Sequence, residues 1–290
     1  MHVPFEWREA EERLAAAPAG WAGMPDGVAV MGIVNVTPDS FSDGGDHLDP
    51  ASARAAAEAM AQTGAAILDI GGESTRPGAS PVTIAEEQAR VLPVIEGLRH
   101  LKVAISIDTR NASTMTAALI AGASIVNDVS ALSHDVAARA VVAASACPVV
   151  LMHMRGTPET MNQLAAYDDV AREVTVELAL RIAAAEAAGI RRERIAVDPG
   201  IGFAKTGKHN RELLRRLPIL LNLGCRVVVG VSRKRMIGQA ADVGRPKQRL
   251  PGSLAAGLFA MAHGASILRV HDVAETVQAL RVKEAISRQS

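Results

Sequence analysis

Polar side chains stand at the ends of several short apolar runs, and their types suit the binding of a polar molecule. Asp108 ends the run VAISID, Asn127 lies near the end of SIVND, and Asp198 ends IAVD. An ionised carboxylate accepts two parallel hydrogen bonds, so these three acceptors together would suit a planar heterocycle with several N–H donors. Each has a structural alternative, since Asp108 could cap a helix beginning near Asn111 and Asp198 could open an Asp-Pro-Gly turn.

Positive charge follows the last two apolar runs. The segment GVSRKRMIG brings Arg233, Lys234 and Arg235, and the segment LRVHDV brings Arg269 and His271. Arg269 and His271 alternate along one run, so a strand would direct both to the same face. Two cations on one face favour an anion, and loops in this part of a barrel often bind phosphate. We expect Arg235 to lie on a solvated surface.

The segment NVTPDSFSDGG (35–45) follows the first apolar run and is longer than a usual loop between a strand and a helix. Loops of this length often act as lids. Its first residue, Asn35, offers a neutral oxygen ligand, and Mg²⁺ commonly takes only one or two protein oxygens when substrate phosphates provide others. An ordinary polar connection is the structural alternative.

The segment DIGGESTRPGAS (69–80) combines several properties that a simple turn does not need. Its paired glycines allow the backbone to turn tightly and approach a ligand. Thr75, Arg76 and Pro77 then offer a hydroxyl, a cation and a rigid wall. By contrast, we expect His153 to be structural, and the sequence has neither a Gly-x-Ser-x-Gly motif nor a two-histidine zinc spacing.

The elements that would position these side chains are strands alternating with helices. A clear helix is predicted after Asp168 and Asp169, which suit its N-terminus, and before Gly189, which suits its C-terminus. The predicted strands are continuously apolar, as in a buried parallel sheet: VAVMGIV (28–34), AILDI (66–70), VAISID (103–108), SIVND (124–128), PVVLMH (148–153), IAVD (195–198), RVVVGVS (226–232) and ILRVH (267–271).

Eight such units favour a (β/α)₈ barrel of residues 28–290, with residues 1–27 as an N-terminal extension. The active site of such a barrel lies at the C-terminal ends of its strands, which is where the acids, amides and cations stand. No Gly-x-Gly-x-x-Gly follows the first strand, which weakens a dinucleotide-binding interpretation.

Composition limits the remaining classes. The chain of 290 residues has 31 basic and 31 acidic side chains and few aromatic ones, so we expect no nucleic-acid partner. No apolar stretch approaches the length of a membrane span, and the acidic N-terminal segment does not read as a signal peptide. The distant Cys147 and Cys225 suit buried hydrophobic positions in a reduced, cytoplasmic protein.

Seven segments in this order resemble the dihydropteroate synthase family of the folate pathway: NVTPDSFSDGG, DIGGESTRPGAS, SIDTR, IVNDVS, DPGIGF, GVSRK and RVHDV. The resemblance extends over roughly residues 28–286. It implies a (β/α)₈ barrel, which the strand pattern also predicts.

The resemblance also implies the reaction and its cofactor. The family joins 6-hydroxymethyl-7,8-dihydropterin diphosphate to 4-aminobenzoate and releases diphosphate with Mg²⁺ present, and a homodimer is the expected assembly. By this similarity the residues that would hold the pterin are Asp108, Asn127, Asp198 and Lys234. Those that would handle the diphosphate and its metal are Asn35, Arg269 and His271. Those that would shape the aminobenzoate site are Phe41, Thr75, Arg76, Pro77, Phe203 and Ser232.

The expected mechanism is a dissociative displacement. An electron-rich pterin could stabilise positive charge at its methylene carbon while Mg²⁺, Arg269 and His271 neutralise the departing diphosphate. The arylamine would then attack, and it needs no strong general base. Two alternatives stay open: a pterin-dependent methyltransferase, which would not need the GGESTRPG loop or the paired basic segments, and a relative that binds pterins without turnover.

Overall fold

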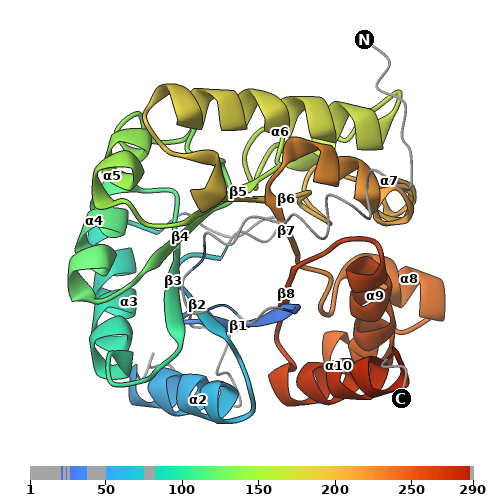
Figure 1. Ribbon diagram of the computed structural model, residues 1–290, viewed down its shortest axis with the longest axis horizontal. Helices are drawn as coiled ribbons and strands as arrows, with labels where there is room; N and C mark the ends of the chain where they lie inside the picture. Colours follow the sequence, from blue (N-terminus) through green and yellow to red (C-terminus); the bar gives the residue numbers. More distant parts are fainter. Residues whose placement is uncertain (1–20, 22–23, 25–26, 38–49, 75–81, 288–290) are drawn as a thin grey trace.

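The strands of the protein close into a parallel barrel in the computed structural model, which describes residues 21, 24, 27–37, 50–74 and 82–287. The first strand pairs with the second and with the last, which completes the ring (Figure 1). The strands are β1 (Ala29–Asn35), β2 (Ile67–Gly71), β3 (Ala104–Asp108), β4 (Ile125–Asp128), β5 (Val149–Met152), β6 (Ile195–Asp198), β7 (Arg226–Val229) and β8 (Ile267–Val270). The predicted (β/α)₈ barrel is confirmed, and each predicted run overlaps one strand.

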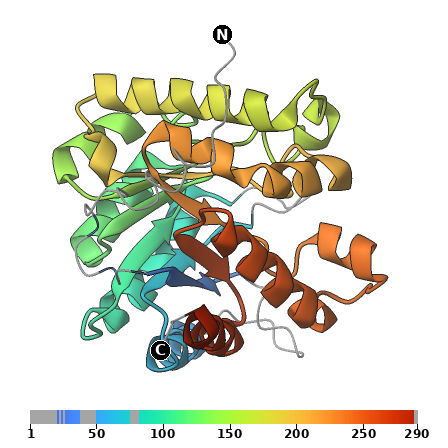
Figure 2. The same cartoon turned by 45° about the vertical axis from the view of Figure 1, so that its right-hand side comes forward.

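Helices surround this ring on its outer side, as Figures 1 and 2 show. They are α2 (Pro50–Gln62), α3 (Ile84–Leu98), α4 (Ala112–Ala121), α5 (Ala138–Ser145), α6 (Val170–Ala187), α7 (Gly207–Arg215), α8 (Arg235–Ala241), α9 (Leu250–Ala262) and α10 (Val273–Ser287). Short 3₁₀ helices are η2 (Met161–Leu164), η3 (Arg192–Arg194), η4 (Leu217–Leu223) and η5 (Pro246–Arg249). None of these described helices is long and apolar enough to cross a membrane.

The helix predicted between Asp169 and Gly189 is α6. The Asp169 side chain accepts a hydrogen bond from the backbone N–H of Arg172, and Gly189 follows the helix with a φ of 93°. That positive φ is the left-handed conformation in which glycine commonly ends a helix. The predicted caps of this helix are therefore confirmed.

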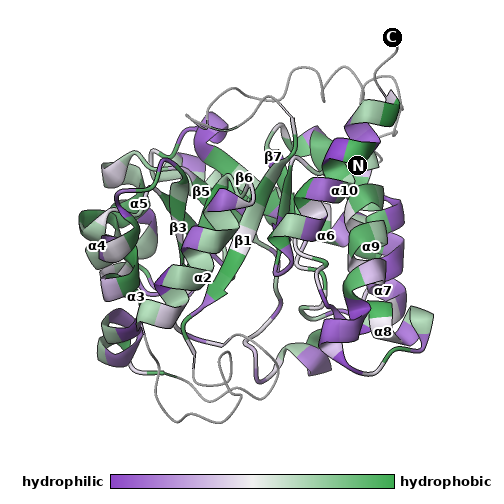
Figure 3. Ribbon diagram, turned by 90° about the horizontal axis from the view of Figure 1, so that it is seen from below, coloured by the Kyte–Doolittle hydropathy of each residue, from purple (hydrophilic) through white to green (hydrophobic). Residues whose placement is uncertain are grey.

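Alternate side chains of each strand face the helices and the inside of the barrel, because successive Cβ atoms of a strand point to opposite faces. The outward set packs against the helices, and the helices direct their hydrophilic faces away from the strands (Figure 3). The inward set begins with a buried cluster at the N-terminal end of the barrel. This floor cluster consists of Trp21, Ala29, Met31, Ile67, Ile125, Val150, Ala196, Val228 and Ile267.

Trp21 connects the N-terminal segment to this floor cluster. Its side chain is only 3% exposed, although the sequence analysis assigns residues 1–27 to an extension outside the barrel. The burial of a large aromatic side chain is a major source of hydrophobic stabilisation. Trp21 therefore contributes to the barrel core. The two cysteines, Cys147 and Cys225, are buried free thiols, as their apolar surroundings in the sequence predict.

Candidate active site at the barrel mouth

The inward positions change from apolar to polar within two residues along the strands. Asp69, Asn127, Asp198 and Arg269 each follow a residue of the floor cluster by two positions on the same strand. The strand register also sets Gly71 opposite Asp108 and Asp108 opposite Asn127. Because residues two apart on a strand share a face, these side chains gather inside the barrel at its C-terminal end, which we call the mouth.

Arg269 lies at the centre of a charged network in the mouth. Its Nε donates to Asp69 Oδ2 at 2.6 Å, and its Nη2 donates to Asp108 Oδ2 at 2.7 Å. The Asn127 side-chain amide donates to the same Asp69 oxygen at 3.0 Å. A guanidinium group carries five N–H donors, so these two bonds leave others that can reach an anion. The network thus joins Arg269, which the sequence analysis assigns to the diphosphate, to two residues assigned to the pterin.

Burial and the neighbouring charges both shift the pKa values of the groups in this network. Burial raises the pKa of Asp108 to about 7, Arg269 opposes that rise, and Asp69 adds to it. Burial also disfavours the charge of Arg269, but Asp69 and Asp108 outweigh it and raise the guanidinium pKa above its ordinary value. Arg269 therefore stays charged, whereas Asp108 can gain or lose a proton near neutral pH.

Asp198 combines a structural contact with an open acceptor. Its Oδ1 accepts the backbone N–H of Gly200 at 2.7 Å, so the Asp-Pro-Gly turn suggested by the sequence is present. Its Oδ2 faces Gly230, where an added Cβ would lie 4.0 Å away. Burial raises the pKa of Asp198, and the Gly200 bond and the charges of Lys234 and Arg269 oppose that rise. The turn therefore uses one carboxylate oxygen and leaves the second facing the mouth.

Lys234 lies beside the aromatic ring of Phe203. The Lys234 ammonium is 4.4 Å from the centroid of the Phe203 ring. An added Cβ at Gly202 would lie only 3.3 Å from Lys234 Cδ, closer than nearly all Cβ contacts. Gly202, whose φ of 86° also favours glycine, thus leaves room for the lysine stem beside the turn.

Ser232 and His271 form the next contact around the mouth. The Ser232 hydroxyl accepts the backbone N–H of His271 at 3.2 Å and lies 3.0 Å from His271 Nδ1. This pair fixes the imidazole beside the end of β8. The guanidinium of Arg233 forms an ion pair with Asp272. Arg235 is exposed, as predicted.

The remaining predicted site residues divide into two groups. Asn35 ends β1, opposite Gly71 and on the inward side of the strand, and is partly buried. Phe41, Thr75, Arg76 and Pro77 lie outside the described residues. Among the residues that the structure does describe, no group of three or more His, Cys, Asp or Glu side chains could hold a metal ion.

The alternative role for Asp108 as a helix cap is not present. The helix α4 begins after Asn111, and Asp135 Oδ2 instead accepts the Ala112 N–H at 2.9 Å. Asp128, the neighbour of Asn127, faces the other way and caps a turn by accepting the N–H groups of Ser130 and Leu132. Because successive side chains of a strand point to opposite faces, Asn127 faces the mouth while the adjacent Asp128 has a structural role.

Two buried charged residues of this region had no assigned role in the sequence analysis. Asp69 opens the segment DIGGESTRPGAS near the end of its strand, and the two-residue strand period directs its side chain into the mouth. Lys205 lies in an irregular loop, where no periodic pattern gives such a signal. Its ammonium contacts His153 Nδ1 at 2.9 Å, while His153 Nε2 lies 3.0 Å from Glu177. His153 is thus held in an internal network, as a structural histidine would be.

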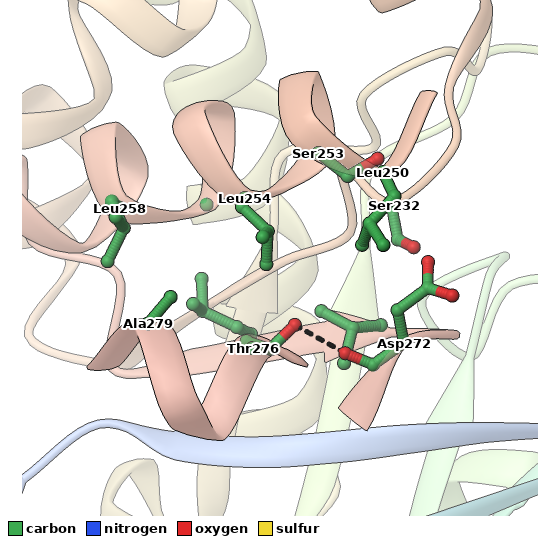
Figure 4. Close-up of a pocket in the computed structure, with 11 residues that line it drawn as sticks. Ser232, Leu250, Ser253, Leu254, Leu258, Asp272, Thr276 and Ala279 are labelled. Atoms are coloured by element: carbon green, nitrogen blue, oxygen red, sulfur yellow. Dashed lines mark hydrogen bonds between the residues drawn. The ribbon is translucent and has the colours of Figure 1, made fainter. Parts of the chain in front are cut away.

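A small cavity lies behind Ser232, between α9 and α10. Figure 4 shows Leu258 and Ala279 at one end and Ser232 and Asp272 at the other. Its volume of about 10 Å³ is close to the space of one water molecule. It cannot hold a heterocycle, so the polar mouth of the barrel is the better candidate for substrate binding.

Comparisons with known proteins agree on one family. The profile of the family described as "Pterin binding enzyme" matches residues 31–271. The dihydropteroate synthase of Escherichia coli strain K12 is 49% identical over 257 residues, which cover 88% of this chain and 90% of the relative. The solved structure of Xanthomonas albilineans dihydropteroate synthase with 4-aminobenzoic acid has a TM-score of 0.86 and 50% identity, covering 91% of this chain and 95% of that one.

A second Xanthomonas albilineans structure holds 7,8-dihydropteroate. It is 47% identical to this chain with a TM-score of 0.83, and the match covers 91% of this chain and 95% of that one. The similarity therefore extends over nearly the whole barrel and includes its mouth.

Proposed function

The chain belongs to the pterin-binding enzyme family, and within it to the dihydropteroate synthases, so we propose that its mouth joins 6-hydroxymethyl-7,8-dihydropterin diphosphate to 4-aminobenzoate. The products would be 7,8-dihydropteroate and diphosphate. The observation that carries this proposal is the acceptor cluster of the partly buried Asp108 and the buried Asn127 and Asp198 beside the cation Arg269. It matches a substrate that has an N–H-rich ring and an anionic leaving group.

The acceptor cluster would bind the ring. Asp198 Oδ2 and the Asp108 carboxylate can accept N–H bonds from an amidine-like edge, and Asn127 adds an amide. Pterin binding would break the hydrogen bond between Arg269 and Asp108. Asp69 would keep its hydrogen bond with the Arg269 Nε. Lys234 would lie against the ring as a cation, and Phe203, 4.4 Å from the Lys234 ammonium, would form the adjoining wall of the aminobenzoate site.

The cations would assist departure of the diphosphate. As the bond to the methylene carbon breaks, negative charge grows on the leaving oxygen, and Arg269 and His271 would stabilise it. The electron-rich pterin would carry the positive charge that remains on the methylene carbon. The arylamine nitrogen would then bond to that carbon and lose a proton. Thr75, Arg76 and Pro77 of the segment DIGGESTRPGAS would position the arylamine. Phe41, Phe203 and Ser232 would complete this site.

Mg²⁺ is the proposed cofactor. Asn35 supplies one oxygen donor at the end of β1, and the described residues offer no acidic metal cage. This donor set fits an ion that is held mainly by substrate phosphate oxygens. When bound, Mg²⁺ would neutralise charge on the diphosphate.

We also propose that the chain acts as a homodimer in the cytoplasm. An open apolar hollow between α9 and α10 is lined by Leu254, Leu258, Val282 and Ile286, of which Val282 is 55% exposed and Ile286 80% exposed. Such a patch suits the face of a second copy, and both free thiols suit a reducing compartment. Light scattering after size-exclusion chromatography would test the dimer, and a monomer at micromolar concentration would contradict it.

Turnover tests the proposed reaction directly. The chain is incubated with the dihydropterin diphosphate, 4-aminobenzoate and Mg²⁺, and dihydropteroate and diphosphate are measured together. We expect both products in equal amounts and only when 4-aminobenzoate is present. Tight binding of the pterin without product would instead indicate a non-catalytic relative, and absence of binding would reject the proposed site.

A further inference from the structure

The turn between β6 and α7 carries two of the side chains assigned to the substrate, Asp198 and Phe203. Its backbone is irregular: Gly200, Gly202 and Ala204 have φ values of 67°, 86° and 47°. A left-handed conformation is unfavourable for alanine, so surrounding contacts must hold this turn in place. Within the turn the Gly200 carbonyl accepts the Phe203 N–H at 3.0 Å, and the carbonyl groups of such an irregular segment take further donors from side chains or water.

Lys205 adds side-chain donors to this turn from inside it. Its ammonium donates to the Gly200 carbonyl at 3.2 Å and the Phe203 carbonyl at 3.0 Å, and it contacts His153 Nδ1 at 2.9 Å. These three contacts match the three N–H groups of an ammonium ion. The residue is only 8% exposed, so water cannot easily replace the contacts.

His153 connects Lys205 to the strand β6 and the helix α6. Its Nε2 lies 3.0 Å from Glu177 Oε2, so the ring donates from Nε2 and keeps the Nδ1 lone pair for Lys205. Its backbone N–H donates to the Asp198 carbonyl at 2.9 Å. An added Cβ at Gly200 would lie 2.0 Å from the His153 carbonyl oxygen, so the turn packs closely on this residue.

Charge links the same lysine to the site. Burial lowers the pKa of Lys205 to about 7, and Asp198 and then Glu177 oppose that fall. Burial lowers the pKa of His153 to about 4, which keeps its ring neutral and able to accept. Asp198 is therefore the leading acidic neighbour of the buried Lys205 amine, whose contacts hold the turn.

We propose that Lys205 is a positioning residue for the pterin site, because it fixes the turn that carries Asp198 and Phe203 against His153. This inference rests on the proposed function, since it assigns the turn to the pterin. Lys205 acts through these two residues and need not touch the substrate. The diphosphate side of the mouth, formed by Arg269 on β8 and His271 just after it, belongs to a different segment from this turn.

Lys205→Met tests this role because it keeps much of the side-chain length and removes every N–H donor. The matched control is Lys208→Met, at an exposed lysine of α7. Calorimetric titration measures the binding of 6-hydroxymethyl-7,8-dihydropterin and, separately, of inorganic pyrophosphate with Mg²⁺. We expect Lys205→Met to weaken pterin binding by about tenfold or more and to leave pyrophosphate binding within about twofold. Lys208→Met should match the wild type for both ligands.

A second variant keeps the test decisive if Lys205→Met does not fold. His153→Phe removes one of the three acceptors, so it should weaken pterin binding in the same direction but by less. A purely structural role would lower the unfolding temperature and leave the folded protein with wild-type pterin affinity. That result in either folded variant would overturn the inference. Failure of the wild type to bind the pterin would instead reject the proposed function.

Discussion

The floor and the mouth of the barrel are built from the same strands but perform different tasks. Only two residues along a strand separate an apolar floor position from a polar mouth position: Ile67 from Asp69, Ile125 from Asn127, Ala196 from Asp198 and Ile267 from Arg269. The floor gains stability from apolar burial. The mouth holds buried charged groups whose hydrogen-bonding capacity is only partly used. This reduces stability and leaves acceptors for a ligand.

Two polar atoms illustrate this difference. Among the described residues, Asp69 Oδ1 and Ser106 Oγ are buried without a hydrogen-bond partner. A buried polar group without a partner destabilises a fold by about 1–3 kcal/mol. The floor cluster must compensate for such losses. Substitutions in the two layers should therefore separate stability from binding.

The largest expected effect is on stability, for Ile67→Ala in the floor cluster. Ile67 is fully buried, and removal of a large aliphatic side chain from a core costs about 2–5 kcal/mol. Urea unfolding should report this loss, while the folded fraction keeps its pterin affinity. Val176→Ala, at a side chain of α6 that is 52% exposed, should change stability by only about 0.5 kcal/mol or less. A large fall in the affinity of folded Ile67→Ala would contradict the separation.

The next effect is on binding, for Asp198→Ala in the mouth. Loss of an ionic acceptor for the pterin N–H groups should weaken binding of the bare pterin by about 1.5–3 kcal/mol. Calorimetric titration measures this change, and Asp168→Ala at an exposed carboxylate is the matched control. Unchanged pterin affinity in Asp198→Ala would count heavily against the assignment of Asp198.

Arg269→Ala should show that the diphosphate and the pterin ring bind to different sides of the mouth. We expect the affinity for the diphosphate ester to fall by roughly tenfold more than the affinity for the bare pterin, because only the ester presents an anion to the lost guanidinium. Arg235→Ala, at an exposed arginine of α8, should change neither affinity. Equal losses for ester and bare pterin would reject the assigned role of Arg269.

The smallest effect is a dependence of pterin binding on pH. Burial raises the pKa of Asp108 to about 7, so the ionised acceptor is present above that pH and is lost as the pH falls through it. From pH 8 to pH 6 the ionised fraction, and with it the pterin affinity, should fall about tenfold. Titrations across this range measure the change. Asp108→Asn, which cannot ionise, should show a flatter profile, and an equally steep one would exclude Asp108 as the titrating group.

The strands and most of the mouth could be predicted from the sequence because they depend on local pattern. Continuous apolar runs marked the strands, and polar residues at their ends marked Asp108, Asn127 and Asp198. The two-residue period of a strand then explains why Asn127 faces the mouth and Asp128 does not. These features need no knowledge of which segments meet in space.

The pairing within the mouth could not be predicted in this way. The bonds of Arg269 to Asp69 and Asp108 cross the interior of the barrel, from β8 to β2 and β3, which are not neighbours of β8 in the closed ring. The role of Lys205 depends on the left-handed residues of an irregular turn and on a histidine from another strand. Side-chain contacts of this kind follow from the closed fold and not from periodicity.

The most direct test of the separation between floor and mouth is the stabilisation that a pterin gives to each variant. Urea unfolding is measured with and without the bare pterin at about one hundred times its wild-type dissociation constant, where binding adds about 2.7 kcal/mol to the free energy of unfolding. We predict that Ile67→Ala keeps this increment despite its lower stability, and that Asp198→Ala loses most of it despite its intact floor. A full increment in Asp198→Ala, or its loss in Ile67→Ala, would contradict the account.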